Sequence, residues 1–116
     1  MNVPENLQEI LDDALAAGVA AGNQKLMDWF DGHDGGACGF AWVHIYDDQG
    51  RKIRKNSKLG KALEAVGIDK DWQGAHMHWG GGMHCQNIDA KEAACQAFAD
   101  VFKQHGFEAY VQSRLD

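Results

Sequence analysis

Apolar residues recur at three- and four-residue steps through the first quarter of the chain. The recurring positions are Leu7, Ile10, Leu11, Leu15, Val19, Leu26, Met27 and Phe30. This spacing places one apolar stripe along an α-helix, and Pro4 suits the first turn of such a helix. We therefore expect an N-terminal helix over about residues 4–30, either continuous or broken near Gly22. A second stripe consists of small residues that would let another helix approach closely: Ala14, Gly18 and Gly22.

From Cys38 to Tyr46 the pattern changes to the alternation of a β-strand rich in β-branched and aromatic residues. Successive side chains of a strand point to opposite faces of its sheet. One face would carry Phe40, Trp42, His44 and Tyr46, and the other Gly39, Ala41, Val43 and Ile45. The two faces of this strand therefore differ sharply in chemistry.

Residues 57–66 favour a short helix. Asn56 or Ser57 supplies its N-cap, and Gly67 marks its end. Residues 74–79 and 83–87 are extended segments, which we expect to pair as a hairpin. The three glycines between them can adopt positive φ wherever the turn requires it.

A second strong helix should run from Asp89, as its N-cap, to Gln104, and residues 107–112 should form the last strand. After the N-terminal helix, the order is strand, helix, strand, strand, helix, strand. This is the order of the ferredoxin-like βαββαβ sandwich, an α+β fold. It predicts a four-stranded antiparallel sheet with both crossover helices on one face. The second face would be solvated, covered by the N-terminal helix, or used for binding.

Length and composition indicate one domain over residues 1–116, with the helix at about 4–30 and an α+β core at about 37–116. The chain has 116 residues, 45% of them hydrophobic, and a formal net charge of −6. No segment has the length and apolar character of a membrane span or a secretory leader, so we expect a cytoplasmic protein. Its three cysteines, in no paired spacing, favour reduced thiols in the core.

Positive charge is concentrated in one short segment. Six of the 11 Lys and Arg residues lie between residues 51 and 61, which contain no acidic residue. The expected ligand-binding residues there are Arg51, Lys52, Arg54, Lys55, Ser57, Lys58 and Lys61. Together with the start of the following helix, they favour an anionic ligand, a nucleic acid or a nucleotide.

Aromatic side chains on the preceding strand would offer a stacking surface beside this segment: Phe40, Trp42 and Tyr46. The opposing interpretation is a solvated basic loop, with Phe40 and Trp42 buried under the N-terminal helix. No RNP-type consensus is present, so RNA recognition of that kind is not indicated.

Three histidines around the glycine turn form a second candidate site: His76, His78 and His84. If Trp79 paired with Met83, these imidazoles would lie on one side of the hairpin and could hold Zn²⁺, as in a metal-binding protein or a metalloenzyme. A shift of register by one residue removes the cluster, and the alternative is exposed histidines that only titrate. We expect no other cofactor. No catalytic constellation is recognisable, which favours a binding protein over an enzyme.

Acidic residues define an alternative function. Glu5, Glu9, Asp12 and Asp13 would form an acidic helical face able to meet a basic partner, as in an inhibitor of a host or defence protein. A homodimer is a further possibility, through either the aromatic sheet face or the stripe of small residues.

Three strings carry a family resemblance: GGACGFAWV at 35–43, QNIDAKEAACQAFADVF at 86–102 and FEAYVQSRLD at 107–116. In these the chain is similar to a family of small proteins encoded by bacteriophages and prophages. The resemblance implies an accessory protein of phage origin that acts in the bacterial cytoplasm. It assigns no catalytic residue, and the histidine-rich segment is not part of the shared pattern.

Overall fold

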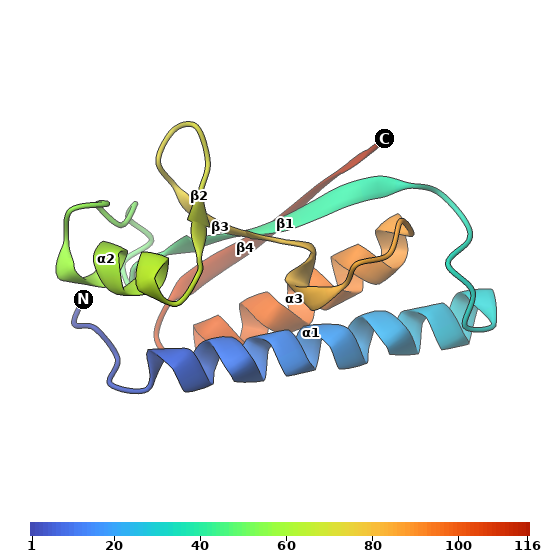
Figure 1. The fold of residues 1–116 in the computed structure, drawn as a ribbon, viewed down its shortest axis with the longest axis horizontal. Helices are drawn as coiled ribbons and strands as arrows, with labels where there is room; N and C mark the ends of the chain where they lie inside the picture. The colour runs from blue at the N-terminus through green and yellow to red at the C-terminus, as the bar shows by residue number, and fades with distance from the viewer.

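The structure, a computed structural model, describes all residues from 1 to 116. Its elements in chain order are α1 (Leu7–Phe30), β1 (Gly39–Tyr46), α2 (Lys58–Ala65), β2 (Asp69–Lys70), β3 (His76–Trp79), the 3₁₀ turn η1 (Gly80–Gly82), α3 (Ile88–Gln104) and β4 (Glu108–Leu115). The strands form one antiparallel sheet in the order β2-β3-β1-β4. Helix α3 packs on one face of this sheet, and α1 packs along α3 on the same side (Figure 1). The α+β class and the four-stranded antiparallel sheet are therefore confirmed.

The N-terminal helix is continuous through Gly22, and its stripe of small residues is buried inside the molecule. A Cβ added to Gly18 would lie 1.8 Å from the carbonyl oxygen of Gly81. One added to Gly22 would lie 2.4 Å from the Met83 side chain. The stripe thus receives the glycine turn η1 rather than a helix of another copy.

The helical layer departs from the ferredoxin-like sandwich. In that fold the first crossover helix lies beside the second, whereas here α1 occupies the place beside α3. Helix α2 has only eight residues and sits at one end of the sheet (Figure 1). Its apolar residues Leu59 and Leu63 still join the common core, which also includes Ile10 of α1 and Phe98 of α3.

One strand is not where the sequence pattern put it. The expected hairpin is wrong, because residues 83–87 form no strand and the short β2 pairs with β3 instead. All three glycines of η1 have positive φ, which turns the chain toward α1 and α3. The carboxylate of Asp34 then accepts the backbone N–H groups of Gln86 and Asn87 at 3.0 and 2.9 Å. These bonds tie the segment to the loop before β1.

Helix caps explain where α2 and α3 begin. Ser57, one of the two expected caps, is the N-cap of α2, since its hydroxyl accepts the N–H of Gly60 at 3.0 Å. The cap of α3 is Asn87 rather than Asp89, and its side-chain oxygen accepts the N–H of Ala90 at 2.9 Å. The same Asn87 amide donates to the carbonyl of Gly35, so one buried side chain joins the helix start to the preceding loop.

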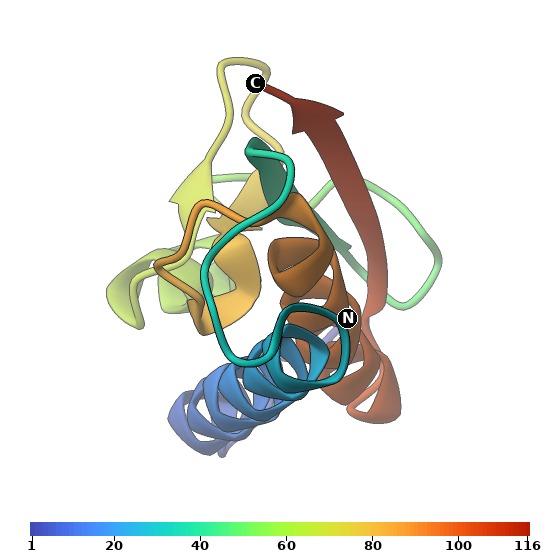
Figure 2. The ribbon, with the colours of Figure 1, turned by 90° about the vertical axis from the view of Figure 1, so that its right-hand side faces the viewer.

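The two faces of β1 lie in different surroundings, as the alternation predicts. Ala41, Val43 and Ile45 are buried under the helical layer. The aromatic face points the other way, and neither α1 nor α3 covers it (Figure 2). The interpretation in which the N-terminal helix covers this face is therefore wrong. No helix in the structure is both long enough and apolar enough to cross a membrane.

Candidate functional site

The uncovered face of the sheet carries a row of aromatic side chains from three strands. Strand register places Trp79 of β3 beside Trp42 of β1, with ring centroids 5.3 Å apart. On the other flank, Tyr110 of β4 lies beside Tyr46, with ring centroids 5.7 Å apart. Aromatic rings of this kind on an open sheet provide flat surfaces on which a planar ligand can stack.

The β2–β3 connection projects from the sheet on this uncovered side (Figure 1). It is a tight turn anchored by Asp71, whose Oδ1 accepts the N–H groups of Gln73 and Ala75, both at 2.9 Å. The other carboxylate oxygen lies 3.1 Å from Nε2 of His44 in β1. Trp72, at the tip of this turn, is 91% exposed. An indole held in water on an anchored turn is available to a ligand.

The charge state of Asp71 suits this anchoring role. Burial alone would raise the pKa of its carboxyl group, but the bonds from Ala75, Gln73 and His44 outweigh burial. The pKa of Asp71 therefore lies below its usual value, and the carboxylate stays ionised near neutral pH.

A hollow of about 390 Å³ lies between this turn and the aromatic row. We call it the tryptophan hollow. Its lining residues are Trp42, His44, Asp71, Trp72, Gln73, Met77, Trp79, Gln112 and Arg114. This size lies within the range of small-molecule sites, and the lining combines aromatic surface with a few polar groups.

The basic residues of 51–61 form a cluster at the α2 end of the sheet. We call this set the basic cluster: Arg51, Lys52, Arg54, Lys55, Lys58 and Lys61. All six are exposed, and no carboxylate lies within ion-pair distance of any of them. Their charge is therefore free to attract an anion.

Two hollows are cut into the basic cluster. One of about 370 Å³ is lined by Arg51, Lys52, Arg54, Ser57 and Lys58, with Met1, Asp47, Ile53 and Leu59. Its single carboxylate, Asp47, is occupied by a turn, because its Oδ1 accepts the N–H of Arg51 at 2.8 Å. That bond holds the pKa of Asp47 below its usual value. The second hollow, of about 440 Å³, is lined by Lys52, Arg54, Lys55, Trp72, Gln73 and Gly74.

The basic cluster and the tryptophan hollow meet at the β2–β3 turn. Trp72 and Gln73 line both the second basic hollow and the tryptophan hollow. The ammonium group of Lys52 donates a hydrogen bond to the carbonyl of Gln73, which fixes the junction. The structure thus joins cationic side chains and indoles into one continuous surface.

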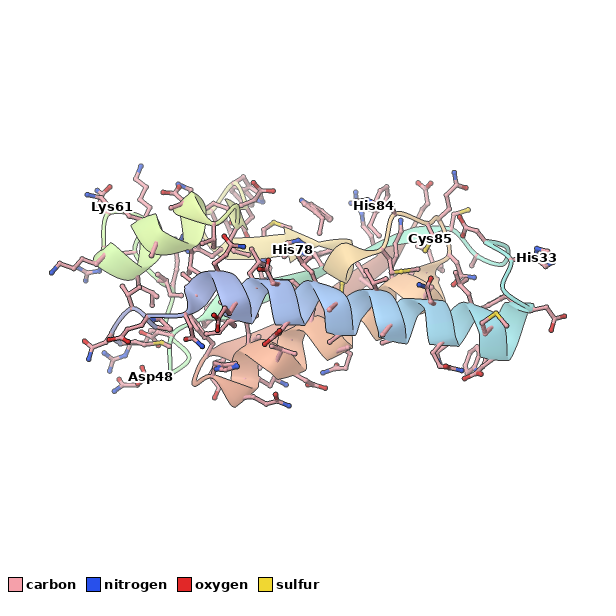
Figure 3. All side chains as sticks on the ribbon, turned by 60° about the horizontal axis from the view of Figure 1, so that its bottom comes forward. His33, Asp48, Lys61, His78, His84 and Cys85 are labelled. Atoms are coloured by element: carbon pink, nitrogen blue, oxygen red, sulfur yellow. The ribbon has the colours of Figure 1, made fainter.

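The expected ligand-binding residues fall into three groups. Arg51, Lys52, Arg54, Lys55, Ser57, Lys58 and Trp42 line these hollows. Phe40 and Tyr46 lie on the same sheet face, outside the tryptophan hollow. Lys61 lies on the outer side of α2 and lines neither basic hollow (Figure 3).

Sequence reasoning missed His44, Asp71, Trp72, Gln73, Trp79 and Arg114 as site residues. One local signal was present, since Asp71 and Gly74 stand at the first and fourth positions of a turn, where Asp and Gly are favoured. A tryptophan inside such a turn lies at the surface rather than in the core, and this points to Trp72.

The three histidines do not come together. His76 and His78 face the helical layer, with the His78 ring stacked on Phe98 at 4.5 Å between centroids. His84 is exposed and lies farther along the molecule (Figure 3). Nowhere does the structure group three or more His, Cys, Asp or Glu side chains able to hold a metal ion. These residues do not fit a zinc site.

Burial dominates the titration of His76 and His78 and lowers the pKa of both imidazoles. His76 is completely buried. Neither of its ring nitrogens has a hydrogen-bond partner of normal geometry, although the nearby Gly60 backbone and Glu64 carboxylate favour the charged form. Its role is therefore in the core.

The cysteines differ in exposure, so the expectation of core thiols holds for one of them only. Cys95 is buried, and burial raises its pKa to about 12. Cys38 is exposed and Cys85 is half-buried. Burial, followed by the nearby Asp34 carboxylate, raises the pKa of Cys85, which disfavours the reactive thiolate.

The acidic residues Glu5, Glu9, Asp12 and Asp13 are all exposed on the first part of the chain, and none forms an ion pair.

No protein-family model, curated protein or solved structure matches this chain.

Proposed function

We propose that this protein binds a nucleotide-type ligand, free or within a nucleic acid. Phosphate would lie on the basic cluster and a base in the tryptophan hollow. The observation that carries the proposal is that Trp72 lines hollows of both kinds. A nucleotide is the common biological ligand that joins an anion to a flat aromatic ring at short range.

Electrostatics supports the phosphate part of this proposal. The molecule as a whole has a net charge of −6, which opposes nonspecific coating of nucleic acids. The basic cluster, however, has no ion-pair partners, and its contacts with the phosphates of a nucleic acid would release counterions condensed along that strand. Binding should therefore weaken steeply as salt is added.

The indoles support the base part. Trp79 is 52% exposed and Trp72 is 91% exposed. A base stacked on either indole would therefore remove apolar surface from water. Stacking of one base on an aromatic side chain contributes about 1–3 kcal/mol. Together with the resemblance to phage-encoded proteins, these indoles support our proposal of a phage accessory protein that binds nucleotides or nucleic acid in the bacterial cytoplasm.

The test is a titration of the protein with a fluorescently labelled thymidine trinucleotide at several salt concentrations. The double variant Arg54→Gln/Lys55→Gln removes two charges that line a hollow with Trp72. We expect its affinity to fall by about tenfold, and the slope of log K against log salt to flatten by about 1.4, since each phosphate contact on a single strand contributes about 0.7.

The matched control is Lys25→Gln/Lys103→Gln, which removes the same charge outside the basic cluster and the tryptophan hollow. Its affinity should stay within about twofold of the wild type. Equal weakening of both variants, or a wild-type protein without salt-sensitive binding, would refute the proposal.

A further inference from the structure

A second cationic and aromatic site lies at the opposite end of β1 from the basic cluster. Phe40 begins the aromatic row, and two cations flank its ring. The Lys91 ammonium lies 5.5 Å from the ring centroid, and the Arg114 guanidinium lies 5.4 Å from it. Arg114 is exposed and has no carboxylate partner.

This second site is continuous with the tryptophan hollow. A further hollow of about 340 Å³ is lined by Phe40, Trp79, His84 and Lys91, together with Ala41, Gly80, Met83 and Cys85. Trp79 also lines the tryptophan hollow, as does Arg114. Neighbouring hollows that share lining residues therefore lead from the basic cluster, past Trp72 and Trp79, to Phe40.

Strand β1 measures the length of this path. Phe40 and Tyr46 stand near its two ends, and six steps of about 3.3 Å separate them by about 20 Å. The turn that leads to Arg51 follows directly after Tyr46. A single nucleotide cannot reach from one charged end to the other, whereas a strand of about four or more nucleotides can.

We infer that the ligand of this face is single-stranded nucleic acid, bound across the whole open face with phosphates at both ends and bases on the indoles between them. This rests on the proposed function, because it assigns the class of ligand to the same surface. Sequence specificity does not follow from it, since stacking accepts every base.

The test compares a labelled thymidine trinucleotide with a labelled oligothymidylate of about twelve nucleotides on the full-length protein. The longer strand should bind at least about tenfold more tightly and with a steeper salt slope, because it alone reaches both charged ends. The variant Lys91→Gln should weaken binding of the longer strand by about threefold to tenfold, because Lys91 lines the hollow beside Phe40 and not the tryptophan hollow. It should leave binding of the trinucleotide to the basic cluster unchanged.

The Lys103→Gln variant is the control, since it removes an exposed charge from α3 that does not line these hollows. Equal affinities and salt slopes for the two lengths, or a Lys91→Gln variant that binds both as the wild type does, would overturn the inference and leave the proposed function standing. If neither strand binds, the proposed function fails as well. Thermal unfolding of each variant at the wild-type temperature confirms that the measured losses reflect contacts.

Discussion

The two faces of β1 come from the same eight residues but have opposite roles. On one face Ala41, Val43 and Ile45 lie completely or almost completely out of contact with water. On the other, Trp42 and His44 line the tryptophan hollow, and His44 also contacts the Asp71 carboxylate of the β2–β3 turn. The first face holds the helical layer in place, and the second presents polar and aromatic groups to solvent.

The comparison shows that the open face is not a core that lacks its cover. A face waiting for a helix would carry aliphatic side chains, whereas this one places an imidazole against a carboxylate and three indoles around a hollow. Stability and ligand binding should therefore respond separately to changes on the two faces.

The largest expected effect is on the covered face. Ile45→Ala removes a fully buried side chain and should lower the free energy of unfolding by about 2–5 kcal/mol, measured by urea denaturation. The matched change on the open face of the same strand is Phe40→Ala, which removes a side chain that is 39% exposed. If Phe40→Ala destabilises the protein as much as Ile45→Ala, the two faces do not differ as described.

Next in size is the contact that supports the helical layer. Gly18→Ala places a methyl group where the Gly81 carbonyl stands, so the backbone of α1 or η1 must move. The loss of stability should be about 1–3 kcal/mol, even though alanine favours the helix more than glycine does. Ala16→Leu on the exposed side of α1 is the control, and its unfolding free energy should change by less than about 0.5 kcal/mol.

Ligand binding should show the reverse sensitivity. Trp79→Ala removes a half-exposed indole that lines both aromatic hollows, and should weaken oligothymidylate binding by about 1–3 kcal/mol with little change in thermal stability. Trp29→Ala serves as the control, because Trp29 is 64% exposed but belongs to α1 on the helical side. Anisotropy titrations of both variants decide the matter, and similar losses would count against the site.

The smallest effect concerns pH. Burial lowers the pKa of His76 and His78 in the folded protein below their value near 6.5 in the unfolded chain. Between the folded and unfolded pKa values the unfolded chain binds more protons, so stability falls as pH drops below about 6.5. Each histidine contributes a slope of at most about 1.4 kcal/mol per pH unit. Urea denaturation at several pH values between 8 and 5 gives the free energy of unfolding as a function of pH. This free energy should vary less with pH in His76→Leu than in the wild type, and an unchanged slope would contradict this assignment.

Patterns within single elements were sufficient to predict much of the fold. The alternation of β1, the Ser57 cap of α2 and the apolar stripe of α3 all depend on residues close in sequence. The basic cluster was also predictable, because its charges follow one another along the chain. Its lack of ion-pair partners was not, since that depends on where every carboxylate ends up.

The rest of the site depends on contacts between distant residues. His44 and Asp71 lie 27 positions apart in the chain. They meet only because β1, β3 and β2 pair in one particular register. Residues 83–87 form no strand, and Asp34, more than 50 positions earlier, accepts the N–H groups of two of them, Gln86 and Asn87. Periodicity carries no information about either contact, so the tryptophan hollow was missed and a hairpin was expected in error.

The position of α2 at the end of the sheet places the basic residues before it beside the open face. Because α1 lies next to α3, the short crossover helix α2 lies at the end of the sheet, and the basic residues that lead into it lie beside Trp72. The position of α1 beside α3 therefore leaves a crossover connection at the border of the open sheet face, where it supplies the cations of the candidate site.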